Sequence, residues 1–296
     1  MFLTALNILG PIVIITLIGY VMGRYLQGMH VETLGELVIL VATPALVFST
    51  LAPMDVAAGM LTTIAGAAVA CVGVSIVFGL VLLRAFGMPA RSFLPSLAFP
   101  NSGNMGLPLA LLAFGQEGLK LGISFFVVIA LAQHTVGYTL ASGNFRIGFL
   151  LRQPLIYAVG AVLVVLATGA PVPAFLLSTA KILGGMMIPA MLIMLGYSLA
   201  KLNVSAVKPA IITGFGRLIA GILSAILVIE LFSLSGVFAG TLFVMATMPS
   251  AIVTYVYAQR FRPDADHVAG AVVVSTLLTF ACLPVLLWIA LRLAEQ

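Results

Sequence analysis

The chain alternates between long apolar stretches and short polar connections along nearly its whole length. A run of roughly 20 apolar residues is long enough to cross the hydrocarbon core of a bilayer as a helix. No connection is long enough to fold as a separate soluble domain. The pattern predicts an all-α protein with ten membrane-spanning helices, near residues 5–25, 34–53, 60–86, 92–114, 119–141, 149–169, 178–200, 209–233, 237–259 and 267–292.

The fourth of these spans contains residues that an ordinary membrane helix avoids. Residues 98–115 form AFPNSGNMGLPLALLAFG, which holds two prolines, two glycines before Pro108, and the asparagines Asn101 and Asn104. Proline removes a backbone N–H, and irregular backbone at membrane depth survives only where protein or a water-filled cavity satisfies it. We predict that the helix unwinds at residues 101–106 and forms a binding site. The alternative is a kinked helix with a purely structural role.

The second half of the chain repeats the first in the opposite orientation. Pro44 of the second span recurs as Pro189 of the seventh, 145 positions later, and both are followed by alanine. The same offset carries the fourth span onto the ninth, which holds Pro249. Paired interrupted spans in two inverted halves are typical of secondary carriers, whose sites lie at the midplane. We therefore divide the chain into repeats at 1–148 and 149–296, a 5+5 inverted arrangement.

Positive charge predicts the orientation, because cytoplasmic loops carry an excess of Lys and Arg. The loops after the odd-numbered spans hold nine such residues, the other side holds three, and Arg217 lies inside the eighth span. Both termini are therefore expected outside the cytoplasm. The nine residues are Arg24, Arg84, Arg91, Arg146, Arg152, Lys201, Lys208, Arg260 and Arg262.

Composition agrees with a multi-pass protein embedded in the lipid bilayer. Hydrophobic residues make up 62% of the chain and charged residues 7%, far from the values of soluble domains. The net charge of +5 is scattered over the loops, so nucleic acid is not an expected partner. No catalytic, phosphate-binding or metal-ligating motif is present in the sequence, and we expect neither an enzyme nor a cofactor.

Four segments together resemble the auxin efflux carrier family, which includes bacterial permeases and the plant PIN exporters. They are TPALVF at 43–48, PNSGNMGLPL at 100–109, MPSA at 248–251 and VVVSTLLTFACLPVL at 272–286. The resemblance implies a scaffold made of spans one, two, six and seven, and a transport domain made of spans three to five and eight to ten. It also implies that the fourth and ninth spans cross at their breaks, that transport is of the elevator type, and that the protein is a homodimer in the bacterial cytoplasmic membrane.

The candidate site residues cluster in and near the two breaks. Residues expected to bind substrate are Asn101, Ser102, Gly103, Asn104, Gln133 and Ser250, and those expected to shape the crossover are Pro100, Pro108 and Pro249. The asparagines have an alternative role as helix caps, because Asn favours turns and helix ends. Gln133 is included because it matches a polar position of the resembled family.

Four further polar residues lie deep inside spans, where such residues face the bundle interior. His134 is a candidate for proton coupling, with a neutral histidine satisfied by a neighbouring helix as the alternative. Ser275 and Thr276 are candidates for ion coupling, with hydrogen bonds to their own helix as the alternative. Arg217 either pairs with an anionic substrate or extends to the cytoplasmic surface, and we favour the second.

These observations lead to a secondary transporter of small organic anions, such as malonate, malate or an auxin-like carboxylate. The driving force is left open between the proton gradient, the membrane potential and sodium. A sodium-coupled symporter of the bile-acid-symporter type and an anion channel remain as alternatives, and a membrane receptor is a third. A carrier is favoured because both halves are interrupted at corresponding positions.

Overall fold

A computed structural model describes residues 2–26, 30–54, 58–145, 147–201 and 206–296. The described residues are helical apart from their connections and one isolated antiparallel bridge. Arg146, one of the nine charges used to predict the orientation, lies outside the described residues. The chain divides into two compact units, each assembled from segments of both halves of the sequence.

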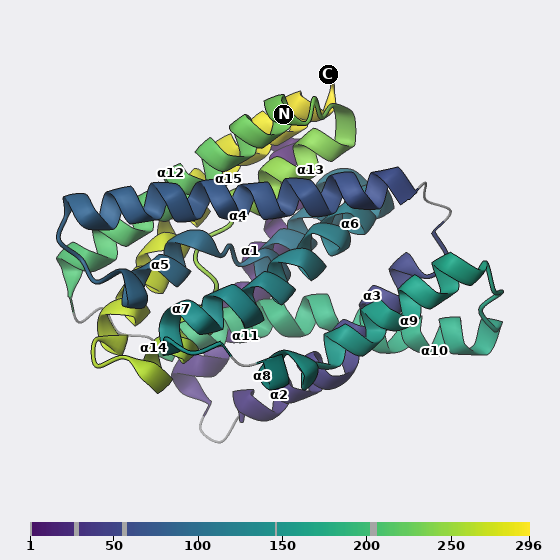
Figure 1. Ribbon diagram of the computed structural model, residues 1–296, viewed down its shortest axis with the longest axis horizontal. Helices are drawn as coiled ribbons and strands as arrows, with labels where there is room; N and C mark the ends of the chain where they lie inside the picture. Colours follow the sequence, from purple (N-terminus) through teal and green to yellow (C-terminus); the bar gives the residue numbers. More distant parts are fainter. Residues whose placement is uncertain (1, 27–29, 55–57, 146, 202–205) are drawn as a thin grey trace. The chain divides into compact units, whose positions relative to one another are not determined.

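The first unit carries the two spans that were predicted to be interrupted, and comprises 1–9, 62–146 and 202–296. In this unit α12 and α15 pack along each other, and α13 packs against both and against α6 (Figure 1). Its helices are α4 (Ala58–Ala85), α5 (Ala90–Ala98), α6 (Leu107–Ala132), α7 (Tyr138–Ser142), α12 (Val207–Leu231), α13 (Gly236–Thr247), α14 (Ile252–Phe261) and α15 (Ala265–Ala294), with π-helical turns η2 (Ser102–Gly106) and η3 (Gln133–Gly137).

The second unit comprises 10–61 and 147–201 and is held together by close helix contacts. Here α3 packs against α9 and α10. Gly19 and Gly23 of α1 form a GxxxG pair against α11, and a Cβ added at Gly19 would meet the backbone of Ile193. Its elements are α1 (Phe2–Tyr25), α2 (Val31–Leu37), η1 (Val38–Ala42), α3 (Thr43–Leu51), α8 (Ile147–Leu151), α9 (Pro154–Thr168), α10 (Ala174–Gly185) and α11 (Met187–Lys201). The first turns of α1 belong to the other unit, and the first turn of α4 belongs to this one.

Helix α6 contains a reversal of the chain direction at Gly115. This residue has φ 64° and ψ −150°, a combination that favours glycine. A Cβ added at Gly122 would lie 3.3 Å from the Cβ of Ala110, whereas twelve residues along a straight helix span about 18 Å. The apolar stretch Ser102–Ser142 is therefore two antiparallel helices joined at Gly115, not one continuous rod.

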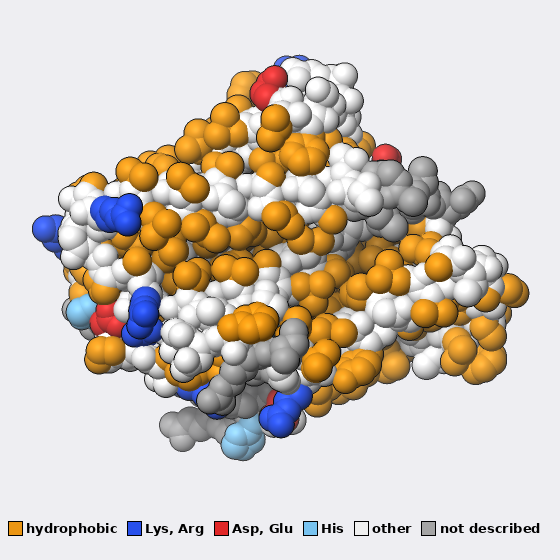
Figure 2. All heavy atoms as spheres, viewed as in Figure 1, with side chains coloured by type: hydrophobic (Ala, Val, Ile, Leu, Met, Phe, Trp, Pro, Cys, Tyr) orange, Lys and Arg blue, Asp and Glu red, His pale blue; other side chains and the backbone are white. Residues whose placement is uncertain are grey.

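Long apolar helices account for most of the described chain. Seven described segments are long and apolar enough to cross a bilayer, and α9 and α13 are shorter apolar helices. Large apolar side chains are exposed along α4, among them Val69, Val77 and Val81. On the face shown in Figure 2 such side chains cover the length of α4, while Lys and Arg lie at the edges. A polytopic membrane protein is confirmed, and the 5+5 layout of ten spans stays a prediction.

Candidate functional site

The two interrupted spans meet in the first unit, where their unwound segments pair as a short antiparallel bridge. The N–H of Asn101 donates to the carbonyl of Pro249 at 2.7 Å, and the N–H of Ala251 donates to the carbonyl of Phe99 at 3.1 Å. Pro100 and Ser250 lie opposite each other between these two bonds. Each break thus satisfies backbone groups of the other, which is what irregular backbone at membrane depth requires. We call residues 99–101 and 248–251 the crossover.

Proline explains where each helix stops. The residue before a proline is pushed out of the helical region, and Phe99 (φ −108°, ψ 114°) and Met248 (φ −61°, ψ 151°) are both extended. The prediction that residues 101–106 unwind is therefore wrong in its position: the unwound stretch is 99–101, and Ser102–Gly106 is a π-helical turn. Pro108 is the second residue of α6, which continues directly from η2, so it lies in the second turn of the helical run that begins at Ser102.

Serine side chains fix the crossover to the helices around it. The Ser250 hydroxyl donates to the carbonyl of Ser96 at 2.7 Å, and the Ser250 N–H donates to the hydroxyl of Ser275 at 3.1 Å. Ser275 donates in turn to the carbonyl of Val272, one turn earlier in α15. Thr276 donates to the same carbonyl at 2.7 Å. Both residues thus make the bonds to their own helix that were the alternative to a role in ion coupling, and Ser275 also holds the ninth span's break.

Arg217 lies deep inside the first unit, in a different place from the one its sequence position predicts. Its side chain is 1% exposed, so the expectation that it extends to the cytoplasmic surface is wrong. Its guanidinium donates to the carbonyls of Leu97 at 2.6 Å, Met248 at 3.1 Å and Ala246. These carbonyls lie at or just beyond the C-terminal ends of α5 and α13, where a helix leaves its last acceptors unpaired. The signal available in the sequence was its position as the one basic residue well inside a span.

Asn101 presents a buried polar group without a partner at the start of the next helical segment. Its side chain is 5% exposed, and its Nδ2 has no hydrogen-bond partner among the described residues. It makes no side-chain cap bond to η2, so the capping interpretation is wrong for this residue. Ser102 and Gly103 follow it and are buried, and Asn104 is half-buried. A buried amide donor left unpaired is costly unless a ligand or water satisfies it.

Gln133 and His134 lie in η3, which packs against the crossover: a Cβ added at Gly137 would lie 3.0 Å from the ring of Phe99. The Gln133 Nε2 is the second buried amide near the breaks without a partner among the described residues. His134 Nδ1 lies 2.7 Å from the hydroxyl of Tyr257, on α14. His134 therefore has a hydrogen-bond partner on a neighbouring helix, as the sequence-based alternative to proton coupling predicted.

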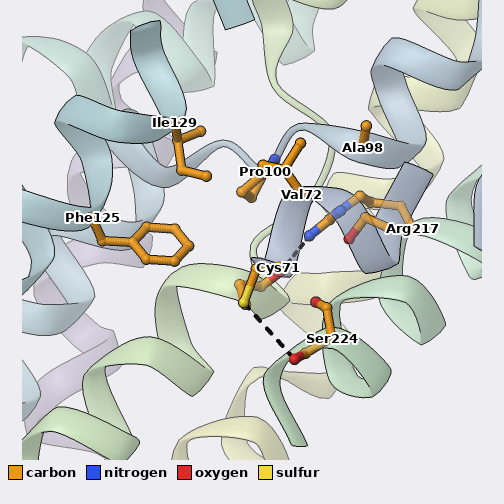
Figure 3. A pocket seen from close by; sticks show the side chains of 10 residues that line it. Cys71, Val72, Ala98, Pro100, Phe125, Ile129, Arg217 and Ser224 are labelled. Carbon is orange, nitrogen blue, oxygen red and sulfur yellow. Dashed lines mark hydrogen bonds between the residues drawn. The ribbon is translucent and has the colours of Figure 1, made fainter. Parts of the chain in front are cut away.

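A small, partly open pocket borders the crossover inside the same unit. Its wall combines Pro100 of the crossover with the apolar side chains of Phe125 and Ile129. Figure 3 shows the Arg217 side chain reaching in from the side opposite these two residues, with Cys71 between them. The Cys71 thiol donates to the carbonyl of Ser224 at 3.8 Å. The pocket is therefore polar at one end and apolar at the other.

These features define a polytopic helical membrane protein in which two broken helices cross, and broken helices of this kind build the sites of secondary transporters. The family model described as membrane transport protein matches residues 5–146 and 148–289. The chain belongs to this family, the auxin efflux carrier family, as its sequence motifs indicated.

One relative covers nearly the full length of both proteins. It is an uncharacterized transporter of Methanocaldococcus jannaschii, 27% identical over 299 residues that include 94% of this chain and 95% of the relative. Family membership makes the protein a multi-pass membrane transport protein and favours a transporter over an enzyme.

Proposed function

We propose that the protein is a secondary carrier of small carboxylates, such as malonate, malate or an auxin-like acid, and that the substrate binds beside the crossover. The observation that carries the proposal is the buried Asn101 amide, which has no partner among the described residues. The unpaired Gln133 amide, on a turn packed against Phe99, is a second donor in the same neighbourhood. Two amide donors without acceptors among the described residues match the acceptor oxygens of a carboxylate.

Helix ends add attraction for an anion. The helical run that begins at Ser102 continues through α6 to Gly115, and α14 begins at Ile252. Both runs start at the crossover, and helix N-termini offer unpaired N–H groups and about half an elementary positive charge each. A carboxylate near Asn101 would receive backbone donors as well as the side-chain amide. Ser102, Gly103, Asn104 and Ser250 complete the set of proposed substrate contacts.

The mechanism that we propose is alternating access by an elevator movement of the unit that carries the crossover, with the other unit as the scaffold. The bridge supports this because two hydrogen bonds tie the broken helices into one piece that moves together. We further propose a homodimer in the bacterial cytoplasmic membrane with both termini outside. Coupling is proposed to use the membrane potential or a proton carried by His134, and Ser275 and Thr276 remain candidates for an ion site.

The test is uptake of radiolabelled malonate, malate and indole acetate into proteoliposomes. Each acid is offered with no gradient, with a pH gradient, with a sodium gradient, and with a potential set by potassium and valinomycin. Saturable uptake of one acid is the expected result, and the gradient that accelerates it names the driving force. No uptake of any acid, in vesicles where a control carrier works, contradicts the proposal. Acceleration by sodium favours the symporter alternative, and currents too fast for a carrier cycle favour the channel.

Two variants connect the assay to residues. Asn104→Ala is expected to abolish uptake while the protein remains folded, and undiminished uptake would remove Asn104 from the site. His134→Gln is expected to abolish acceleration by a pH gradient, because glutamine keeps a hydrogen bond to Tyr257 but carries no exchangeable charge. Acceleration that survives this change excludes His134 as the proton carrier.

A further inference from the structure

Arg217 joins the two broken helices through charge as well as through hydrogen bonds. Its three acceptors are carbonyls of Leu97 in the first half of the chain and of Ala246 and Met248 in the second. A guanidinium has five N–H donors, so these bonds leave it donor capacity. Close packing of α12 fixes the position of the guanidinium. Gly221, one turn further along α12, lets that helix approach the end of α13. A Cβ there would lie 2.6 Å from the Ala246 oxygen.

Four helix ends meet at the crossover, two with a partial negative charge and two with a partial positive charge. α5 and α13 end there with negative C-termini, while η2–α6 and α14 begin there with positive N-termini. Each end is equivalent to about half an elementary charge, so the four ends nearly cancel. The buried guanidinium adds one full positive charge to this balanced set. The C-termini are then neutralised, and the N-termini remain available for an anion.

The charge of Arg217 is not cancelled by any acidic side chain that the structure describes. Within the described ranges, the close ion pair joins Arg292 to Glu295, both exposed. A charged group at membrane depth is costly unless it is paired, and carbonyl dipoles compensate it only in part. One negative charge arriving at the crossover would complete the balance.

We propose that Arg217 is a fixed internal cation that sets the crossover to bind its substrate through one negatively charged carboxylate group. It offsets the C-termini of α5 and α13 and so lets the opposing N-termini attract one negative charge. Arg217 is a positioning residue, since it acts through the helix ends and through residues 99–101 and 248–251. The inference rests on the proposed function for its substrate, but the role of the charge in holding the crossover does not.

The first experiment tests the charge without measuring transport. Cys71 borders the same pocket and is 3% exposed, so its alkylation reports opening of the crossover region. In a Cys282→Ser background, Arg217→Ala is expected to speed alkylation of Cys71 by at least about tenfold, because three buried carbonyls lose their donors. A few millimolar guanidinium should restore protection, whereas urea at the same concentration should not. Urea has a similar planar shape and N–H donors but no charge. Equal rescue by urea would overturn the proposal.

The second experiment compares two substitutions by long polar side chains, one of which is charged and one neutral. Arg217→Lys keeps a cation, and Arg217→Gln keeps hydrogen-bond donors without one. Uptake of the monoanion of malonic acid monoamide is compared with uptake of neutral malonamide in proteoliposomes. The wild type and Arg217→Lys should prefer the anion, and Arg217→Gln should lose that preference by at least about tenfold, as expected for removing a nearby unit charge. An unchanged preference in Arg217→Gln overturns the proposal.

The outcomes separate this inference from the proposed function. If the wild type takes up no carboxylate, the proposed function fails, while selective rescue by guanidinium still supports the charge of Arg217 as a requirement of the crossover. If the wild type takes up carboxylates and Arg217→Gln keeps the same preference, the proposed function stands and the inference fails.

Discussion

Replacing Asn101 with alanine separates a substrate-binding role from a structural one, because the two roles predict opposite changes in stability. The Asn101 side chain makes no cap bond, and its Nδ2 has no partner among the described residues. Alanine therefore removes no internal bond made by that amide nitrogen. It removes a buried donor that no described residue accepts from, and the main-chain bond from Asn101 to Pro249 is retained.

The expected magnitudes follow from hydrogen-bond energies. A hydrogen bond to a charged group contributes about 1.5–3 kcal/mol, so losing the amide donor should weaken carboxylate binding by roughly 10- to 150-fold. Leaving a buried donor unpaired costs about 1–3 kcal/mol, so its removal should leave the unfolding free energy unchanged or raise it by up to about 2 kcal/mol after some loss of packing. Weaker binding together with undiminished stability is the signature of a ligand-binding residue.

The assay pairs uptake kinetics with thermal unfolding followed by circular dichroism in detergent. Asn144→Ala is the matched control, since Asn144 is exposed and lies in the turn after α7. It should change neither the KM for uptake nor the melting temperature. A marked loss of stability in Asn101→Ala would show that the side chain supports the fold. An unchanged KM would refute the assignment of Asn101 to the site.

Two predictions concern the packing and bonding of the crossover. Gly221→Ala should destabilise the protein by about 1–3 kcal/mol through overpacking against the end of α13. The control Gly160→Ala, at a glycine with open space around it, should be neutral or stabilising. Equal melting temperatures of the two variants would refute the close approach of α12 to α13. Ser275→Ala should cost about 1–3 kcal/mol because it leaves the Ser250 N–H without its acceptor. Thr276→Val, which removes a bond within its own helix, should cost less, and the reverse order in thermal unfolding would contradict the role assigned to Ser275.

The sequence identified the interrupted spans because proline acts locally. Pro100 and Pro249 disrupt their helices through their own geometry, so their positions can be recognised without knowing any partner. The connection predicted between residues 114 and 119 likewise corresponds to the reversal at Gly115, which depends on the conformational freedom of one residue. The exact residues that unwind were harder to predict. A π-helical turn at Ser102–Gly106 restores helical hydrogen bonding immediately after the break.

The partners of Arg217 could not be predicted from the sequence. They lie 29, 31 and 120 residues away, and all three are main-chain carbonyls, which every residue carries. Sequence patterns identify a carboxylate partner by its side chain, but a helix end becomes an acceptor only once the chain has folded. The distance of Arg217 from the start of its span therefore favoured the wrong interpretation. The same reason hid the link from Ser250 to the Ser96 carbonyl.

The crossover also constrains how the protein is made. The Ser250 hydroxyl and the carbonyl of Ser96 are separated by 154 residues in the sequence, and the bridge at Pro100 depends on the same late segment. At a synthesis rate of about 5–20 residues per second, the first break waits roughly 8–30 s for its partner. During that interval the Phe99 carbonyl lacks its donor, the Ala251 N–H, and the Asn101 N–H lacks its acceptor, the Pro249 carbonyl. The backbone of the first break therefore reaches its final hydrogen bonding only after the ninth span has been synthesised.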